Sequence, residues 1–364
     1  MAEMTRLFAG VDGGATKTWA VVGDETGRLL GFGAGGPANY HVVGMDFTMR
    51  SVTTALSEAL SAAARRAEPG VAATSPVAAT SPPPLSCLAR IGFYLAGDDS
   101  KEDHINLGAA LAALVPAGVG YQWGNDSWAA LRGGTLKGWG AVCIGGSGTN
   151  SAAVSPEGKS AILRGLGRDA GCPGGASEIV REAVYWAFRM DEGMCPKTSL
   201  HGAVLEALGL RDYDEAVREY MGNELAFSYR AMGVVTPVVF RLAREGDPTA
   251  QHVLIEVGRL MGEQTGAVMV RAGIELLEAD VVLAGSVYRG ESPLLIDSLT
   301  TAVHRFAPKA KPVPPRYHPV VGAYLLALEG GGLNVGPGIY ASLDETVEGS
   351  LPAPEAPAPP GTVE

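Results

Sequence analysis

The sequence predicts an α/β protein of two domains. Its 364 residues suffice for two domains of ordinary size, and 46% of them are apolar, enough to build two cores. Short apolar strands alternate with segments of helical periodicity. In addition, one arrangement occurs twice and indicates an internal duplication: a strand, a glycine-rich turn, a strand, an acidic turn and a third strand.

The first copy of this arrangement lies near the start of the chain. "RLFAGV", "WAVVG" and "RLLGFG" are predicted strands, because they are apolar runs separated by the turns "DGGATKT" and "DETG". A helix is expected over 46–67, where Met49, Val52, Leu56 and Leu60 recur at helical spacing. Strands are next predicted in "LARIGFYLAG" and "GVGYQWGND", with one helix over 101–114 and another from Ser127.

The second copy is "GWGAVCIGGSGTNSAAVSPEGKSAIL". An offset of 133 residues places Thr149 over Thr16 and Gly146 over Gly13. A mostly helical segment, 176–272, precedes a buried strand at "ADVVLAG", a helix, and a last helix near "HPVVGAYLLALEGGG".

Two further segments have a composition that does not favour a packed structure. "VAATSP" occurs twice in tandem, and the C-terminus is rich in Pro and Ala, so neither buries enough surface to offset the cost of ordering. We expect an N-terminal domain at 1–120 with a disordered insertion near 69–86, a C-terminal domain at 121–345 with the helical insertion 176–272, and a disordered tail at 346–364.

Charge and composition exclude several classes of function. The net charge is −11 and the Lys and Arg residues are scattered, which disfavours a nucleic-acid partner. The N-terminus lacks the features of a signal peptide, and no apolar run approaches the roughly 18 residues of a membrane span. We therefore expect a cytoplasmic protein with no membrane partner.

The four cysteines show no CxxC spacing, which disfavours disulfides and a structural zinc site. One of them, Cys172, lies in the unusual stretch "GCPGG" just before a helical pattern. Two interpretations stay open at this point: a redox or metal site, or a ligand-binding loop whose usual chemistry has been altered.

The turn "DGGATKT" has the composition of a phosphate-binding loop. Its paired glycines let backbone N–H groups approach a phosphate, while Thr16, Lys17 and Thr18 add hydroxyls and a positive charge. The spacing fits neither GxxxxGK[ST] nor GxGxxG. Asp12, at the end of a strand, is suited to hold Mg²⁺ through water, since Mg²⁺ favours one or two carboxylates with substrate phosphates. The alternative is an ordinary hairpin turn.

Three more features indicate ligand binding. "GGSGTN" at 145–150 is a second glycine-rich turn, and "AGSVYRG" at 284–290 is a third, suited to the close approach of a flat nucleoside. Asp126 lies where a strand ends and a helix begins, and an ionised carboxylate there can accept a proton from a substrate hydroxyl during phosphate transfer. The alternative for Asp126 is a helix N-cap.

In this order, the motifs "DGGATKT", "NDSWAAL", "GGSGTN" and "LAGSVYRG" resemble the BadF/BadG/BcrA/BcrD-type ATPase family, and within it the N-acetylglucosamine kinase-like branch. The resemblance covers about residues 6–340. It implies two ribonuclease-H-like domains of the actin, hexokinase and Hsp70 superfold, which close on ATP, Mg²⁺ and a sugar. It also implies a homodimer.

The same resemblance implies roles for individual residues. Asp126 is the expected base that deprotonates the 6-hydroxyl of the sugar, and Asp12 the expected Mg²⁺ residue. Contacts to ATP are expected from Gly13, Gly14, Thr16, Lys17, Gly146, Ser147, Gly148, Thr149, Gly285 and Ser286. Contacts to the sugar are expected from Asn39, Asn125, Asp126, Gly148, Asp169 and Cys172.

The chain departs from the family pattern after the second glycine-rich turn. The kinases carry "GWG" and then "GDEGS" or "GDWGG", whose Asp binds sugar hydroxyls. Here "GLG" and "GCPGG" replace them, so Leu166 stands for the Trp and Cys172 for the Asp. A thiol cannot match a carboxylate as an acceptor for two hydroxyls. Asp169 is the candidate to compensate.

The leading hypothesis is an ATP-dependent kinase that phosphorylates the 6-hydroxyl of an amino sugar: N-acetylglucosamine, glucosamine or a related hexose. One alternative is a BadF-type ATPase that activates a dehydratase or reductase through a [4Fe–4S] cluster, although the cysteine-rich motif for a cluster is missing. Another is a non-catalytic homologue that binds sugar or nucleotide, which the departures at Cys172 and Leu166 suggest.

Overall fold

The computed structural model describes residues 5–67, 83–290 and 292–351. The described residues divide into two compact units: 5–138 with 315–351, and 139–314. Most of the expected insertion at 69–86 and the tail from 352 onward lie outside the described residues. None of the described helices combines the length and the apolar character that crossing a bilayer requires.

The first unit contains a five-stranded sheet in the order β3-β2-β1-β4-β5, in which β2 is antiparallel to β1 and β3 while β4 and β5 run parallel to β1. Its strands are β1 (Leu7–Gly13), β2 (Thr18–Asp24), β3 (Leu29–Gly35), β4 (Leu88–Leu95) and β5 (Gly120–Asn125). Its helices are α1 (Tyr40–Val43), α2 (Met45–Ala67), α3 (Lys101–Leu114), α4 (Asp126–Gly134), α11 (Pro319–Gly330) and α12 (Pro337–Thr346), with the short 3-10 helix η1 (Leu85–Cys87) before β4.

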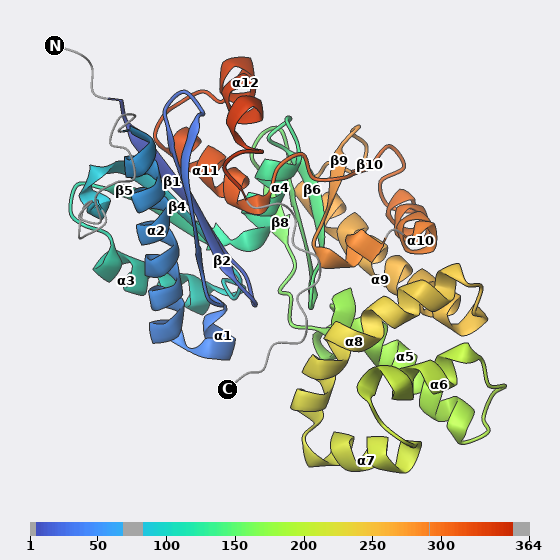
Figure 1. Ribbon diagram of the computed structural model, residues 1–364. Coiled ribbons are helices and arrows are strands. Elements are labelled where there is room, and N and C mark those ends of the chain that lie inside the picture. The colour runs from blue at the N-terminus through green and yellow to red at the C-terminus, as the bar shows by residue number, and fades with distance from the viewer. Residues whose placement is uncertain (1–4, 68–82, 291, 352–364) are drawn as a thin grey trace. The chain divides into compact units, whose positions relative to one another are not determined.

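Alternating glycines let α2 pack directly on this sheet. Gly31, Gly33 and Gly35 lie along β3 at a spacing of two, so all three face the same side. A methyl group on them would lie 2.0, 2.1 and 2.2 Å from backbone oxygen atoms of α2. The helices α2 and α3 share this face, and α11 covers the opposite face (Figure 1).

The second unit contains a sheet in the order β10-β9-β6-β7-β8. Its strands are β6 (Gly140–Gly145), β7 (Thr149–Val154), β8 (Ser160–Ile162), β9 (Asp280–Ala284) and β10 (Lys311–Val313). Its helices are η2 (Arg168–Ala170), α5 (Gly175–Asp191), α6 (Ser199–Leu208), α7 (Tyr213–Gly222), α8 (Glu224–Arg244), α9 (Pro248–Ala272), η3 (Ser286–Gly290) and α10 (Pro293–His304). The run from α5 to α9 occupies the segment that we expected to be helical.

The two sheets have the same topology, because the order β3-β2-β1-β4-β5 is repeated as β8-β7-β6-β9-β10. The register corrects our alignment of the two copies. Gly13 pairs with Thr18 in the first hairpin, and Gly145 pairs with Thr149 in the second. Thr149 therefore corresponds to Thr18 rather than to Thr16, since the first turn has four residues (14–17) and the second has three (146–148).

The units also differ from the expected domains in their bounds. β5 and α4 belong to the first unit, and the segment from 315 returns to it, because α11 packs on β1 and β4. Residues 346–351, expected to be part of the disordered tail, belong to the described fold instead. They contact α2, where Nη2 of Arg66 donates to the Gly349 carbonyl at 3.0 Å. At the other expected loop, residues 85 and 86 form part of η1.

Candidate active site

The carboxyl ends of three parallel strands meet at one edge of the first sheet. Gly13 of β1, Leu95 of β4 and Asn125 of β5 are register partners. The segments that follow them therefore begin side by side, where open α/β sheets commonly bind their ligands. This edge brings together the predicted residues Asp12, Gly13, Gly14, Asn125 and Asp126.

Asp126 is the first residue of α4 but does not cap the helix. The N-cap is Asn125, whose side-chain oxygen accepts a hydrogen bond from the Ser127 N–H at 2.9 Å. The N-cap alternative for Asp126 is therefore wrong. The Asn125 amide also donates to Oδ1 of Asp99 at 2.8 Å. Burial, and then the charge of Asp99, raises the pKa of Asp126 to about 7. A carboxyl group with this pKa is suited to accept a proton near neutral pH.

Asp12 is, like Asp126, a carboxyl group whose surroundings at this edge of the sheet disfavour its ionised form. Burial and the negative charge of Asp126 raise its pKa to about 7, while the charge of Lys17 acts in the opposite direction. Nδ1 of His318 lies 3.9 Å from its Oδ2. Two neighbouring carboxyl groups with raised pKa values favour a bound cation, and Mg²⁺ prefers oxygen ligands.

These residues fit Mg²⁺ that is held mainly by phosphate and water. Nowhere in the described part of the chain do three or more His, Cys, Asp or Glu side chains gather as a metal cluster. One or two carboxylates are enough for Mg²⁺, because it retains several waters and binds substrate phosphates.

An aromatic stack lies beside Lys17. Its Nζ is 3.7 Å from the centroid of the Trp19 ring, and the Trp19 and His318 rings have centroids 4.1 Å apart. A ring face attracts an ammonium group, so the stack restricts where the Lys17 charge lies. We missed both rings in the sequence, since Trp19 reads as an apolar strand residue and His318 is far away along the chain.

The loop after β4 adds carboxylates that the sequence analysis also missed. Asp98 binds Nδ1 of His104 at 2.9 Å, and the N–H of Asp99 donates to Asp103. Burial, with the charge of Asp103, raises the pKa of Asp99 to about 6. The available signal was a pair of aspartates directly after a predicted strand, the same signal that identified Asp126.

Asn39 lies against this loop. Its Oδ1 accepts a hydrogen bond from the His41 N–H at 3.1 Å and caps α1. A methyl group on Gly97 would lie 2.9 Å from the same Oδ1. Asn39 therefore reaches the segment that carries Asp99, although the two lie in different loops.

At three positions of the predicted phosphate loops the fold does not require glycine. Gly14, Gly146 and Gly148 lack a positive φ, and a methyl group on them would meet no atom closer than 3.5 Å. Gly13 differs, because a methyl group added there would lie 2.5 Å from the Leu95 side chain. Larger residues fit the fold at the first three positions, so packing does not explain the glycines there, and the predicted contact with a ligand stays a prediction. Thr16, Ser147 and Gly148 are exposed.

The start of α5 supports the second glycine-rich loop through backbone hydrogen bonds. The N–H groups of Ala176 and Ser177 donate to the carbonyls of Gly146 and Ser147, both at 2.9 Å. Gly175 has a φ of 72°, and a methyl group on it would lie 2.2 Å from the Gly148 carbonyl oxygen. The two glycines that end "GCPGG" are therefore required by packing against the loop.

Two residues that we predicted to contact ATP, Thr149 and Gly285, also make contacts within the fold. The Thr149 hydroxyl donates to the Ile144 carbonyl at 2.7 Å, so in this conformation its proton is not available to a phosphate oxygen. Gly285 has a φ of 112°, and a methyl group on it would lie 2.3 Å from the Gly145 carbonyl oxygen. Packing between the ends of β9 and β6 therefore explains this glycine. Ser286 begins η3 and is exposed.

The "GCPGG" loop begins with a tight turn. The Cys172 N–H donates to the Gly167 carbonyl at 2.8 Å, and its side chain is nearly buried. Asp169 and Leu166 are exposed. Cys143 lies in the core, where its thiol faces the Met261 carbonyl. Of the two open interpretations of this stretch, the geometry favours the ligand loop, because the loop rests on the second glycine-rich turn.

Comparison with known proteins identifies the family. The model of the BadF/BadG/BcrA/BcrD ATPase family matches residues 9–327. The chain belongs to this family. A relative of this ATPase-family protein is the N-acetyl-D-glucosamine kinase of Dictyostelium discoideum, 26% identical over 325 residues, which are 88% of this chain and 98% of the relative. An N-acetylmuramic acid/N-acetylglucosamine kinase of Clostridium acetobutylicum is 25% identical over 203 residues, 56% of this chain and 65% of the relative.

Solved structures share the fold of this ATPase-family protein. One from Chromobacterium violaceum, provisionally assigned as an N-acetylglucosamine kinase, has a TM-score of 0.64 at 22% identity and covers 88% of this chain and 99% of its own. A ROK-family glucokinase from Streptomyces griseus, in complex with glucose and AMPPNP, has a TM-score of 0.54 at 17% identity, with 89% and 100% covered. The predicted two-domain fold of the hexokinase type is confirmed.

Proposed function

We propose that the protein is an ATP-dependent sugar kinase that phosphorylates the 6-hydroxyl of an amino sugar: N-acetylglucosamine, glucosamine or a related hexose. The observation that carries the proposal is Asp126. It lies at the carboxyl edge of the sheet, is not used as a helix cap, and has a pKa raised to about 7. The sugar class follows from the kinases to which the chain is related.

In the proposed reaction, Asp126 accepts the proton of the sugar hydroxyl. The sugar oxygen forms a bond to the γ-phosphorus of ATP while the bond from this phosphorus to the bridging oxygen of ADP breaks. The two glycine-rich loops and Lys17 bind phosphate oxygens through N–H groups and positive charge. Asp12 would hold Mg²⁺ through water, and the ion would supply positive charge that offsets the negative charge of the phosphates.

The remaining assignments are part of the same proposal. Gly285 and Ser286 flank the adenosine, and Asn39, Asn125, Gly148, Asp169 and Cys172 contact the sugar. The family resemblance also supports a homodimer, and we retain the cytoplasm as the expected location. The cluster-dependent ATPase is less well supported, since the sequence relatives named above are sugar kinases.

The first test is release of ADP over a panel of hexoses, N-acetylhexosamines and free amino sugars, with and without Mg²⁺. Asp126→Asn should lower kcat roughly 10²- to 10⁴-fold, because it removes the base, while ADP binding stays near that of the wild type. The rate should rise with pH through about 7, since Asp126 accepts a proton only when ionised.

The matched control is Asp297→Asn, which changes an exposed aspartate of α10 in the same way. It should leave kcat unchanged. Full activity of Asp126→Asn would contradict the assignment of the base, and no turnover of any sugar by the wild type would favour the non-catalytic alternative.

A further inference from the structure

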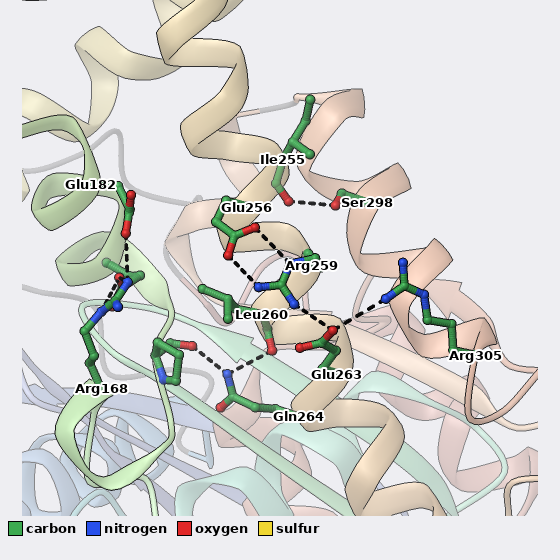
Figure 2. Close-up of polar contacts among 12 residues, drawn as sticks. Arg168, Glu182, Ile255, Glu256, Arg259, Leu260, Glu263, Gln264, Ser298 and Arg305 are labelled. Atoms are coloured by element: carbon green, nitrogen blue, oxygen red, sulfur yellow. Dashed lines mark hydrogen bonds and ion pairs between the residues drawn. The ribbon is translucent and has the colours of Figure 1, made fainter. Parts of the chain in front are cut away.

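A buried carboxylate at the start of α5 connects the two loops of the second unit that the proposed function uses. Glu178 lies in the first turn of α5, and its side chain is only 3% exposed. It binds the guanidinium of Arg168, whose Nε donates to Glu178 Oε1 at 2.8 Å and whose Nη2 also contacts the same oxygen. Nη2 of Arg168 also donates to Glu182 Oε1 at 2.8 Å (Figure 2).

Arg168 belongs to the turn that presents Asp169 and Cys172. This turn, 167–172, is closed by backbone hydrogen bonds from Gly171 to Arg168 at 2.9 Å and from Cys172 to Gly167 at 2.8 Å. Backbone bonds define its internal shape but do not attach it to the rest of the unit. The guanidinium supplies an attachment, since it links the turn to two successive turns of α5.

The same first turn of α5 supports the second phosphate loop. Ala176 and Ser177, the two residues before Glu178, donate their N–H groups to the carbonyls of Gly146 and Ser147. Gln264 of α9 adds a contact from the other side, where its Nε2 donates to the Pro173 carbonyl at 2.5 Å and to the Leu260 carbonyl at 3.0 Å (Figure 2). The segment 173–178 is therefore bonded at both ends.

We propose that Glu178 is a positioning residue for substrate binding, which fixes the 167–172 turn through Arg168 relative to the phosphate loop carried by the same helix turn. The charge of Glu178 is well placed for this role, because a carboxylate is favoured in the first turn of a helix and a hydrogen bond between ionised partners is stronger than one between neutral groups. The effect on catalysis rests on the proposed function, since it requires that the turn contacts the sugar.

The test compares Glu178→Gln with Glu182→Gln. Glu178→Gln should raise KM for the sugar about 10-fold, with KM for ATP and kcat changed much less, because a weakened Arg168 contact releases only the turn. Glu182→Gln, which removes the more exposed partner of the same guanidinium, should change KM for the sugar by less than about 3-fold. Arg168→Gln, at a half-exposed position, should reproduce the Glu178→Gln effect even if that variant folds poorly.

Hydrogen–deuterium exchange gives a readout that does not depend on activity. The amides of 167–172 should exchange faster in Glu178→Gln and Arg168→Gln than in the wild type, and those of 146–149 should change less. Unchanged exchange in 167–172 would overturn the proposal whatever the substrate. Faster exchange with an unchanged sugar KM would overturn it as well. A wild type that phosphorylates no sugar would refute the proposed function, while the exchange data would still decide whether Glu178 holds the turn.

Discussion

At Cys172, a nearly buried thiol stands where the kinases that the chain resembles carry an aspartate that binds sugar hydroxyls. The neighbouring Asp169 is exposed, and its role as a substitute carboxylate stays a prediction. Cys172→Asp should lower KM for N-acetylglucosamine about 10-fold, because a hydrogen bond to a charged acceptor contributes about 1.5 to 3 kcal/mol.

Steady-state kinetics with N-acetylglucosamine and glucosamine measure this effect. Cys172→Ser is the control, since it matches the size of the thiol without adding a charge, and it should leave KM near the wild-type value. If Cys172→Asp does not improve the use of N-acetylglucosamine, the loop recognises a different sugar.

At the scale of elements, close helix packing in the second unit depends on three glycines of α9. Gly258, Gly262 and Gly266 face α10 and the segment after it, and a methyl group on Gly262 would lie 2.3 Å from the Leu299 carbonyl oxygen. Gly262→Ala should therefore destabilise the protein by about 1 to 3 kcal/mol, because the two helices must separate, although alanine is the better helix former.

Urea unfolding followed by circular dichroism measures this change. The control is Gly202→Ala in α6, an exposed helical position where a methyl group meets no atom within 4 Å. It should raise the free energy of unfolding by up to about 1 kcal/mol. Equal stabilisation by both substitutions would show that α9 and α10 are not packed as described.

For the whole molecule, the site makes stability depend on pH. Burial and like charge raise the pKa of Asp12 and Asp126 to about 7, and that of Asp99 to about 6. Each group binds its proton more tightly in the folded chain than in the unfolded chain. The free energy of unfolding should therefore fall as pH rises from about 4 to about 7, because the unfolded chain releases these protons first.

The double variant Asp12→Asn/Asp126→Asn should be more stable than the wild type at pH 8 by about 1 to 3 kcal/mol, with the difference shrinking toward pH 4. Chemical unfolding in EDTA at several pH values measures it, with Asp297→Asn as the control. A difference that is independent of pH would contradict the altered ionisation. The same two substitutions should abolish transfer, as expected where function opposes stability.

Local patterns predicted much of the fold and part of the site. The helix over 101–114 has the expected bounds, and Asp126 lies at the expected junction of strand and helix. These features are local, since helical spacing, strand composition and turn residues act over a few positions. Trp19 and His318 could not be paired in this way, because a hairpin strand and a helix near the C-terminus come together only in the tertiary fold.

The sequence by itself determined the class of fold, the duplicated strand arrangement, the glycine-rich loops and the acidic residue at the end of β5. Each of these features depends on residues that are close together along the chain. Only the tertiary structure decided that Asn125 rather than Asp126 caps α4, that α11 returns to the first unit, and that the last two glycines of "GCPGG" pack against the second glycine-rich hairpin. The physical reason is that capping, burial and close backbone contact depend on which segments distant in sequence become neighbours in space.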